Sequence, residues 1–272
     1  FTSNEDITAF GDIYFRAGSN VLASSTCDID IRGDMIIEDG SNLNITGGYV
    51  NFEGPDTSRL ICHQDSAALK QLRINKSSGA PFYFDASSTG DLFINATLYN
   101  MSSNVSYGDA PIKVYLNRSY LNNGGHLYCD STHFVFSGNA GLTPFKMMPG
   151  DYLQDLTIQS TSHLNVDNTY SDTVHIKGDL NIYFNSSGSS GIDANGVYFL
   201  MGGEWWNNYG SGAFVHGNNT VEFENDEYED IFKNRKYDLC DSEINVIASY
   251  SGLHRNSINT ALKMLKSTGT LN

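Results

Sequence analysis

Short stretches in which apolar and polar residues alternate recur along most of this chain of 272 residues. Examples are DIYF (12–15), NLNITGGYVNFEG (42–54), DLFINATLY (91–99) and NTVEFEN (219–225). Alternation with a period of two places successive side chains on opposite faces of a strand, and the Gly, Asn, Ser and Asp residues between the stretches favour turns. The pattern predicts many short strands that are joined by tight turns.

Two segments carry a helix-like pattern instead. They are DSAALKQLRI (65–74) and NSINTALKMLKSTG (256–269), in which Ala, Leu and Lys are good helix formers. Each segment predicts a turn or two of helix in an otherwise strand-rich chain.

The chain also repeats itself over a longer distance. Three segments align on a shared phenylalanine: GGYVNFEGP (47–55), STHFVFSGN (131–139) and NNTVEFEND (218–226). The three phenylalanines, Phe52, Phe136 and Phe223, lie 84 and 87 residues apart. We therefore expect a single solenoid segment over 1–272, within a longer chain, that contains about three long repeats. Their approximate bounds are 1–88, 89–175 and 176–272.

A Gly-Asp pair marks the start of several predicted strands. Gly90-Asp91 returns as Gly178-Asp179, 88 residues later, and Gly33-Asp34 is an earlier copy. Gly33-Asp34 belongs to the tripeptide Arg32-Gly33-Asp34, which in other proteins binds integrins. Because the pair recurs at strand starts, we interpret this RGD as part of the scaffold.

The shorter spacing points to the fold. Within each long repeat, strands recur about every 20 residues, a step that fits one coil of a parallel β-helix. One coil cannot bury its inward side chains alone, whereas stacked coils form a continuous core. We predict an all-β, right-handed parallel β-helix with short strands; a tandem β-sandwich array is the alternative, because a unit of about 85 residues also suits one sandwich. The predicted core residues are Phe52, Ile74, Phe136, Ile158, Phe223 and Val246.

The charge balance argues against some partners. The formal net charge is −15, and only 17% of the residues are charged. A negative surface repels nucleic-acid phosphates, so no nucleic-acid partner is expected. No run of 18 apolar residues occurs, so no membrane-spanning helix is expected. The abundance of Gly, Asn, Ser and Thr is typical of an extracellular β protein.

One stretch resembles a known kind of repeat unit. GVYFLMGGEWWNNYGSGAFVHGNNTVEFEND (196–226) is similar to a unit of very large, repetitive surface proteins of the Bacteroidota. The matching positions are Gly202, Gly203, Trp205, Asn207, Gly210, Phe214, Gly217, Thr220, Val221 and Phe223. The closing Gly of the unit is replaced by Asn225, and looser copies at 47–55 and 131–139 extend the resemblance along the chain.

The resemblance implies a secreted, adhesin-like or gliding-motility-type protein of the bacterial cell surface, exported by type IX secretion. Its partners would be extracellular glycans or surfaces, other protein chains and a secretion translocon. Bacteroidota also O-glycosylate Ser or Thr after Asp, so the resemblance implies a glycoprotein. Ser66, Ser131 and Thr173 match this pattern.

Aromatic residues are the predicted ligand contacts. Trp205, Trp206 and Tyr209 are candidates because exposed aromatic rings can stack on sugars. Adjacent residues of a strand point to opposite faces, so only one of the two tryptophans is expected to face the core.

An acidic run, EFENDEYEDIF (222–232), contains the candidate metal site. Asp226, Glu227 and Asp230 supply carboxylate oxygens, which Ca²⁺ prefers. A solvated acidic surface is the competing interpretation, and Ca²⁺ is the only cofactor that we consider.

Four cysteines, Cys27, Cys62, Cys129 and Cys240, allow three pairings. In an exported protein, Cys27–Cys62 or Cys129–Cys240 could form a disulfide. It is equally consistent with the sequence that the cysteines are buried free thiols.

No catalytic residue is proposed, because the seven histidines are scattered and neither G-x-S-x-G nor H-E-x-x-H occurs. We expect a non-catalytic, extracellular adhesin-like or structural solenoid that presents loops to glycans, surfaces or neighbouring chains. One alternative is a β-helix polysaccharide lyase or hydrolase, which would need carboxylates from adjacent coils on one face. The other alternative is a subunit of an extracellular filament or sheath.

Overall fold

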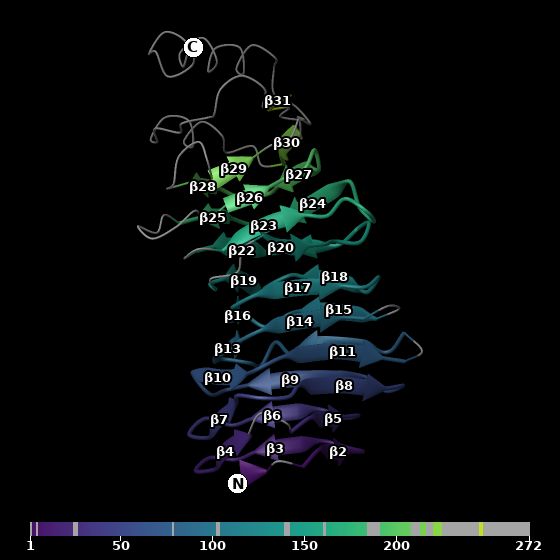
Figure 1. The fold of residues 1–272 in the computed structure, drawn as a ribbon, viewed down its shortest axis with the longest axis vertical. Coiled ribbons are helices and arrows are strands. Elements are labelled where there is room, and N and C mark those ends of the chain that lie inside the picture. Colours follow the sequence, from purple (N-terminus) through teal and green to yellow (C-terminus); the bar gives the residue numbers. More distant parts are fainter. Residues whose placement is uncertain are drawn as a thin grey trace.

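The computed structural model describes residues 2–3, 5–23, 27–77, 79–101, 104–138, 142–159, 162–183, 191–207, 213–215, 220–224 and 245–246. These residues form an all-β solenoid whose strands stack along one long axis (Figure 1). Every strand pair among them is parallel, and the strands from β2 to β30 take three faces in turn, one strand to each face in each coil. The prediction of a parallel β-helix is confirmed, and the β-sandwich alternative is wrong because sandwich sheets are antiparallel.

Two sheets run along the whole described solenoid. The ten-stranded sheet consists of β1 (Thr2–Ser3), β4 (Asn20–Ala23), β7 (Asn42–Ile45), β10 (Ser66–Leu69), β13 (Asp91–Ile94), β16 (Lys113–Leu116), β19 (His133–Phe136), β22 (Asp155–Ile158), β25 (Leu180–Ile182) and β28 (Trp205–Asn207). The eleven-stranded sheet consists of β3 (Ile13–Phe15), β6 (Met35–Ile37), β9 (Ser58–Cys62), β12 (Pro81–Phe84), β15 (Val105–Gly108), β18 (His126–Cys129), β21 (Tyr152–Leu153), β24 (Thr173–Ile176), β27 (Tyr198–Met201), β30 (Thr220–Phe223) and β31 (Asn245–Val246).

The third face is divided between two sheets. The six-stranded sheet consists of β2 (Ile7–Ala9), β5 (Ile29–Ile31), β8 (Val50–Gly54), β11 (Leu72–Lys76), β14 (Thr97–Asn100) and β17 (Ser119–Asn122). The four-stranded sheet continues this face with β20 (Leu142–Phe145), β23 (His163–Val166), β26 (Gly191–Asp193) and β29 (Phe214–Val215) (Figure 1).

The length of a coil varies along the chain. The step between paired residues ranges from 20, where Val114 pairs with Phe134, to 28, where His163 pairs with Gly191. The predicted step of about 20 residues is therefore close to the shortest coil.

The interior is a continuous column of apolar side chains. Phe52 and Phe82, from neighbouring faces, place their ring centroids 4.8 Å apart. Five of the six predicted core residues are confirmed as buried, with at most 8% exposure: Phe52, Ile74, Phe136, Ile158 and Phe223. For the sixth, Val246, the structure describes only the backbone.

The spacing of 84 and 87 residues is not a stacking period. Phe52 lies in β8, Phe136 in β19 and Phe223 in β30, so each lies eleven strands after the previous one. A full coil contains three strands, so eleven strands correspond to three full coils and two further strands. The three phenylalanines therefore lie on three different faces and do not stack on one another.

Residues 65–74 form strands β10 and β11, so the helical turn predicted there is wrong. The side chains of Ala67, Leu69, Leu72 and Ile74 alternate with more exposed neighbours and are buried in the core. Burial and pairing with both adjacent coils outweigh the helix propensity of Ala, Leu and Lys. The second helix-like segment, 256–269, lies outside the described residues.

A repeated hydrogen bond accounts for two of the three Gly-Asp pairs, Gly33-Asp34 and Gly178-Asp179. Asp34 donates its backbone N–H to Asp12 Oδ1 of the preceding coil at 2.8 Å, and Asp179 donates to Asp155 Oδ1 at 2.7 Å. A Cβ at Gly33 would overlap Asp12 Oδ1, and one at Gly178 would overlap Asp155 Oδ1. Only Gly leaves room for the carboxylate of the coil below, which supports a scaffold role for Arg32-Gly33-Asp34.

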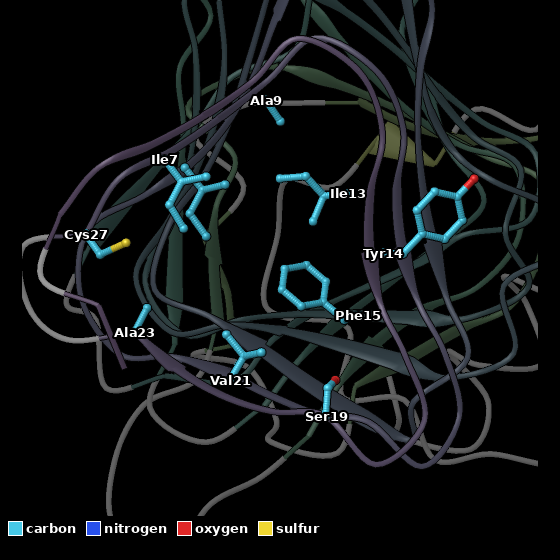
Figure 2. A pocket seen from close by; sticks show the side chains of 10 residues that line it. Ile7, Ala9, Ile13, Tyr14, Phe15, Ser19, Val21, Ala23 and Cys27 are labelled. Atoms are coloured by element: carbon cyan, nitrogen blue, oxygen red, sulfur yellow. The ribbon is translucent and has the colours of Figure 1, made fainter. Parts of the chain in front are cut away.

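The first coil lines an apolar cavity. Figure 2 shows Ile7, Ile13 and Phe15 pointing into an apolar cavity of about 310 Å³, while Tyr14 points away from it. Ile7 and Ile13 are half-buried, whereas the residues paired with them in the next coil, Ile29 and Met35, are buried.

Candidate ligand-binding face

A row of aromatic side chains runs along the outer face of the eleven-stranded sheet. In β12, Phe82 and Phe84 are buried in the core, so Tyr83 between them faces outward. The strand register continues this outward position from coil to coil. The row, here called the tyrosine ladder, consists of Tyr83, Tyr107, Tyr128, Tyr152 and His175.

The rings of the tyrosine ladder contact one another along the axis. The centroids of Tyr83 and Tyr107 lie 4.9 Å apart with the planes 13° from parallel. The next separations are 5.8 Å to Tyr128, 5.5 Å to Tyr152 and 6.1 Å to His175. Parallel strands are spaced about 4.8 Å apart, so the sheet itself holds the rings within contact distance. Each side chain is half-buried.

A row of carboxylates runs beside the ladder. Asp85, Asp109 and Asp130 each follow a ladder tyrosine by two residues, at Tyr83, Tyr107 and Tyr128. Each donates its backbone N–H to a carbonyl of the preceding coil at 3.1 Å: to Leu60, Phe84 and Gly108, respectively. We call these three residues the acidic row.

The two ends of the acidic row each hold a cation from the protein. Arg59 Nε lies 3.4 Å from Asp85 Oδ2, and its guanidinium lies 5.9 Å from the Tyr83 ring centroid. Lys177 Nζ lies 2.7 Å from Asp130 Oδ1 and 3.5 Å from the Tyr152 ring centroid. The Tyr152 hydroxyl also donates to Asp130 Oδ2 at 3.2 Å.

Asp109, in the middle of the acidic row, differs from both ends. None of the ion pairs found among the described residues involves it. Partial burial raises the pKa of Asp109, and the charges of Asp130 and Asp85 raise it further. At Asp130, the hydrogen bond from Lys177 lowers the pKa.

The sequence contains a signal for this face that the alternation of apolar and polar residues does not reveal. Tyr83-Phe84-Asp85, Tyr107-Gly108-Asp109 and Tyr128-Cys129-Asp130 form a Tyr-x-Asp motif, repeated after 24 and then 21 residues. Both spacings correspond to one coil. A search for short motifs at the coil step could have found all three.

A histidine–carboxylate pair borders the ladder. His126 Nδ1 lies 2.9 Å from Asp151 Oδ1, and the His126 ring stacks on Tyr128 with centroids 5.7 Å apart. The Asp151 side chain has no exposed surface, and Met148 donates its backbone N–H to Asp151 Oδ2 at 2.9 Å. Burial raises the pKa of Asp151 to about 6, although the hydrogen bonds from Met148 and His126 oppose that rise.

The predicted ligand contacts lie away from the tyrosine ladder. Trp205 packs against the core, with its ring centroid 4.7 Å from that of Phe214. Trp206 follows it on the ten-stranded sheet, pairs in register with Asn181 and is half-buried. Tyr209 lies outside the described residues, so the three aromatic residues are not shown to form one site.

The predicted calcium ligands Asp226, Glu227 and Asp230 also lie outside the described residues. In the part of the chain that the structure describes, no group of three or more His, Cys, Asp or Glu residues is arranged to hold a metal ion.

The three candidate glycosylation sites differ in accessibility. Ser66 and Ser131 are exposed, whereas Thr173 is half-buried. The Thr173 hydroxyl donates to Asp172 Oδ1 at 3.1 Å. Ser66 and Ser131 are therefore the more accessible acceptors.

The described cysteines are free thiols. Cys27, Cys62 and Cys129 are all buried, so the structure contains no Cys27–Cys62 disulfide, and Cys240 lies outside the described residues. Cys27 lies in the turn before β5 and Cys62 at the end of β9, on different faces. Burial raises the pKa of Cys62 to about 11 and also raises that of Cys129.

Within the described residues there is no helix of the length and apolarity needed to span a bilayer. No protein-family model, curated protein or solved structure matches this chain.

Proposed function

We propose that this protein is a non-catalytic solenoid of a bacterial cell surface, adhesin-like or structural, that is secreted and binds glycans along its outer face. The tyrosine ladder supports this proposal. The resemblance of 196–226 to repeat units of Bacteroidota surface proteins supports the cell-surface location, and with it export by type IX secretion and O-glycosylation.

The physical case rests on how the ladder is held. Tyrosine combines a large apolar ring with a polar hydroxyl, and it loses little conformational entropy when it binds. In the ladder, Tyr107, Tyr128 and Tyr152 each contact the ring above and the ring below. A ligand therefore meets an ordered row of ring edges and hydroxyls, and preorganisation of this kind favours binding.

The test compares two stacked aromatic pairs on different faces. Tyr107 belongs to the ladder, whereas Tyr115 stacks on Phe93 at 4.4 Å on the ten-stranded sheet. We expect Tyr107→Ala to weaken glycan binding about three- to tenfold, the loss of one aromatic contact. Tyr115→Ala removes a ring from the other face and should leave affinity within about twofold of wild type. Binding is measured on a glycan array and then by isothermal titration calorimetry.

Failure of the purified protein to bind any glycan would contradict the proposal. Equal loss of affinity in both variants would contradict the placement of the site on the eleven-stranded sheet. Circular dichroism spectra that match wild type confirm that each variant remains folded.

A polysaccharide lyase or hydrolase is the second function that we consider, and the acidic row favours it. Adjacent coils bring Asp85, Asp109 and Asp130 together on one face, and a carboxyl with a raised pKa suits a general acid. However, Asp85 and Asp130 are held in ion pairs, and hydrolysis by paired carboxylates needs a second free group beside Asp109. Release of shorter saccharides by the purified protein, abolished in Asp109→Asn, would establish the enzyme and replace the binding function.

The other alternative is a subunit of an extracellular filament or sheath, which would associate end to end. Sedimentation velocity at several protein concentrations measures this self-association. A constant sedimentation coefficient would exclude it.

A further inference from the structure

At both ends of the acidic row, a cationic side chain of the protein lies against a carboxylate and a ring of the tyrosine ladder. At the Asp85 end, Arg59 lies against both the carboxylate and the Tyr83 ring. At the Asp130 end, Lys177 lies against both the carboxylate and the Tyr152 ring. The middle of the row repeats this placement in sequence and register, since Asp109 follows Tyr107 by two residues and Tyr107 pairs with Tyr128 of the next coil. None of the ion pairs found among the described residues involves Asp109.

The two end positions show what the middle position can accept. An ammonium or guanidinium group gains both from the carboxylate charge and from the electron-rich face of an aromatic ring beside it. Lys177 achieves both contacts at short range, 2.7 Å to the oxygen and 3.5 Å to the ring centroid. A primary ammonium on a ligand has the same shape and charge as the lysine head group.

The local charge also favours a cation at Asp109. Its carboxylate is partly buried between two other carboxylates, which raises its pKa. A cation at this position would relieve that repulsion and satisfy the remaining carboxylate. The whole chain carries a formal net charge of −15, which attracts cationic ligands over longer distances and repels acidic glycans.

We propose that Asp109, with the rings of Tyr107 and Tyr128, binds the ammonium group of an amino sugar in a glycan with free amino groups. This proposal rests on the glycan-binding function proposed above and names its ligand class. The straight row of rings, with successive centroids 4.9 Å and 5.8 Å apart, favours an extended saccharide that lies along the solenoid axis.

The experiment uses two saccharide probes of equal length. One is a glucosamine oligomer with free amino groups, and the other is the same oligomer fully N-acetylated. We expect the wild-type protein to bind the free-amine oligomer at least tenfold more tightly at low ionic strength, and the preference to shrink as salt is added. Asp109→Asn should weaken binding of the free-amine oligomer about fivefold and leave binding of the acetylated oligomer unchanged.

Two further variants distinguish a specific site from a general charge effect. Asp39→Asn removes one negative charge from an exposed turn, where Asp39 Oδ1 accepts the Gly40 N–H, a bond that Asn can keep. It should bind like wild type. Lys177→Gln frees Asp130 and opens a second cation position, so it should bind the free-amine oligomer about threefold more tightly.

The outcomes separate this inference from the function on which it rests. If neither oligomer nor any other glycan binds, the proposed function fails. If glycans bind but the acetylated oligomer binds as well as the free amine, or Asp109→Asn binds like wild type, the cation site is overturned and the glycan function stands. If a lysine oligopeptide of equal charge binds more tightly than the glucosamine oligomer, the face recognises protein, and the amino-sugar assignment is wrong.

Discussion

Replacing Gly90 with Ala should break the contact between two adjacent coils near the middle of the solenoid. The Gly90 and Thr89 N–H groups both donate to the Cys62 carbonyl, at 3.0 Å and 2.8 Å. A Cβ at Gly90 would overlap the Gln64 carbonyl oxygen and lie 3.1 Å from Asp65 N. Both neighbours are backbone atoms, so the methyl group can be accommodated only if one coil moves away from the other.

The expected cost can be estimated from these contacts. Weakening two hydrogen bonds costs about 0.5–1.5 kcal/mol each, and forcing an extra methyl group into a packed region costs about 1–3 kcal/mol. The lower entropy of the unfolded Ala chain offsets about 0.4–1 kcal/mol of this. The sum predicts that Gly90→Ala lowers the free energy of unfolding by about 3 kcal/mol.

Gly11→Ala is the matched control. Gly11 also precedes an Asp, but a Cβ there meets no described atom within 4 Å, and neither glycine has a positive φ. We expect Gly11→Ala to change stability by less than about 1 kcal/mol, in the stabilising direction. Urea unfolding followed by circular dichroism gives the global change, and amide hydrogen exchange in β9 and β13 gives the local one. The reasoning is refuted if Gly90→Ala is as stable as wild type, or if both variants lose the same amount.

Two further predictions concern buried ionisable groups. The pKa of Asp151 is about 6 in the fold and about 3.9 in an unfolded chain, so the folded state binds the proton more tightly. The protonated Asp151 carboxyl therefore stabilises the folded state. This contribution to the free energy of unfolding is complete below about pH 4 and is lost as the pH rises to about 6. Urea unfolding should therefore show wild type losing about 2–3 kcal/mol relative to Asp151→Asn over this range, whereas parallel pH profiles would contradict the burial argument. Separately, native-state alkylation followed by peptide mass analysis should leave Cys27, Cys62 and Cys129 unmodified; rapid labelling of any of the three would contradict their burial.

The alternation of side chains made the core predictable. Phe52, Ile74 and Phe136 each lie at a buried position of a period-two stretch, and the structure buries all three. Residues 65–74 were mistaken for a helical turn because propensity is local. The pairing that overrides it joins residues more than twenty positions apart, such as Ala67 with Leu92.

The arrangement of the faces was harder to predict. Because a coil takes 20 to 28 residues, an uncertainty of a few residues per coil becomes a change of face after three or four coils. The Tyr-x-Asp motif at Tyr83, Tyr107 and Tyr128 can be recognised as a periodic feature only when the length of each coil is known. The contact of Lys177 with Asp130, 47 residues away, depends on side-chain reach across two coils and has no signal in the sequence.

The parallel pairing of all described strands has a mechanical consequence. Hydrogen bonds between neighbouring strands point along the long axis, so pulling on one end of the chain would detach the outermost coil first and then the coils behind it, one at a time. Each coil that peels off would release about 70–100 Å of extended chain, given its 20 to 28 residues. Under load, the solenoid would behave as a tether that lengthens in discrete steps and keeps its remaining coils intact.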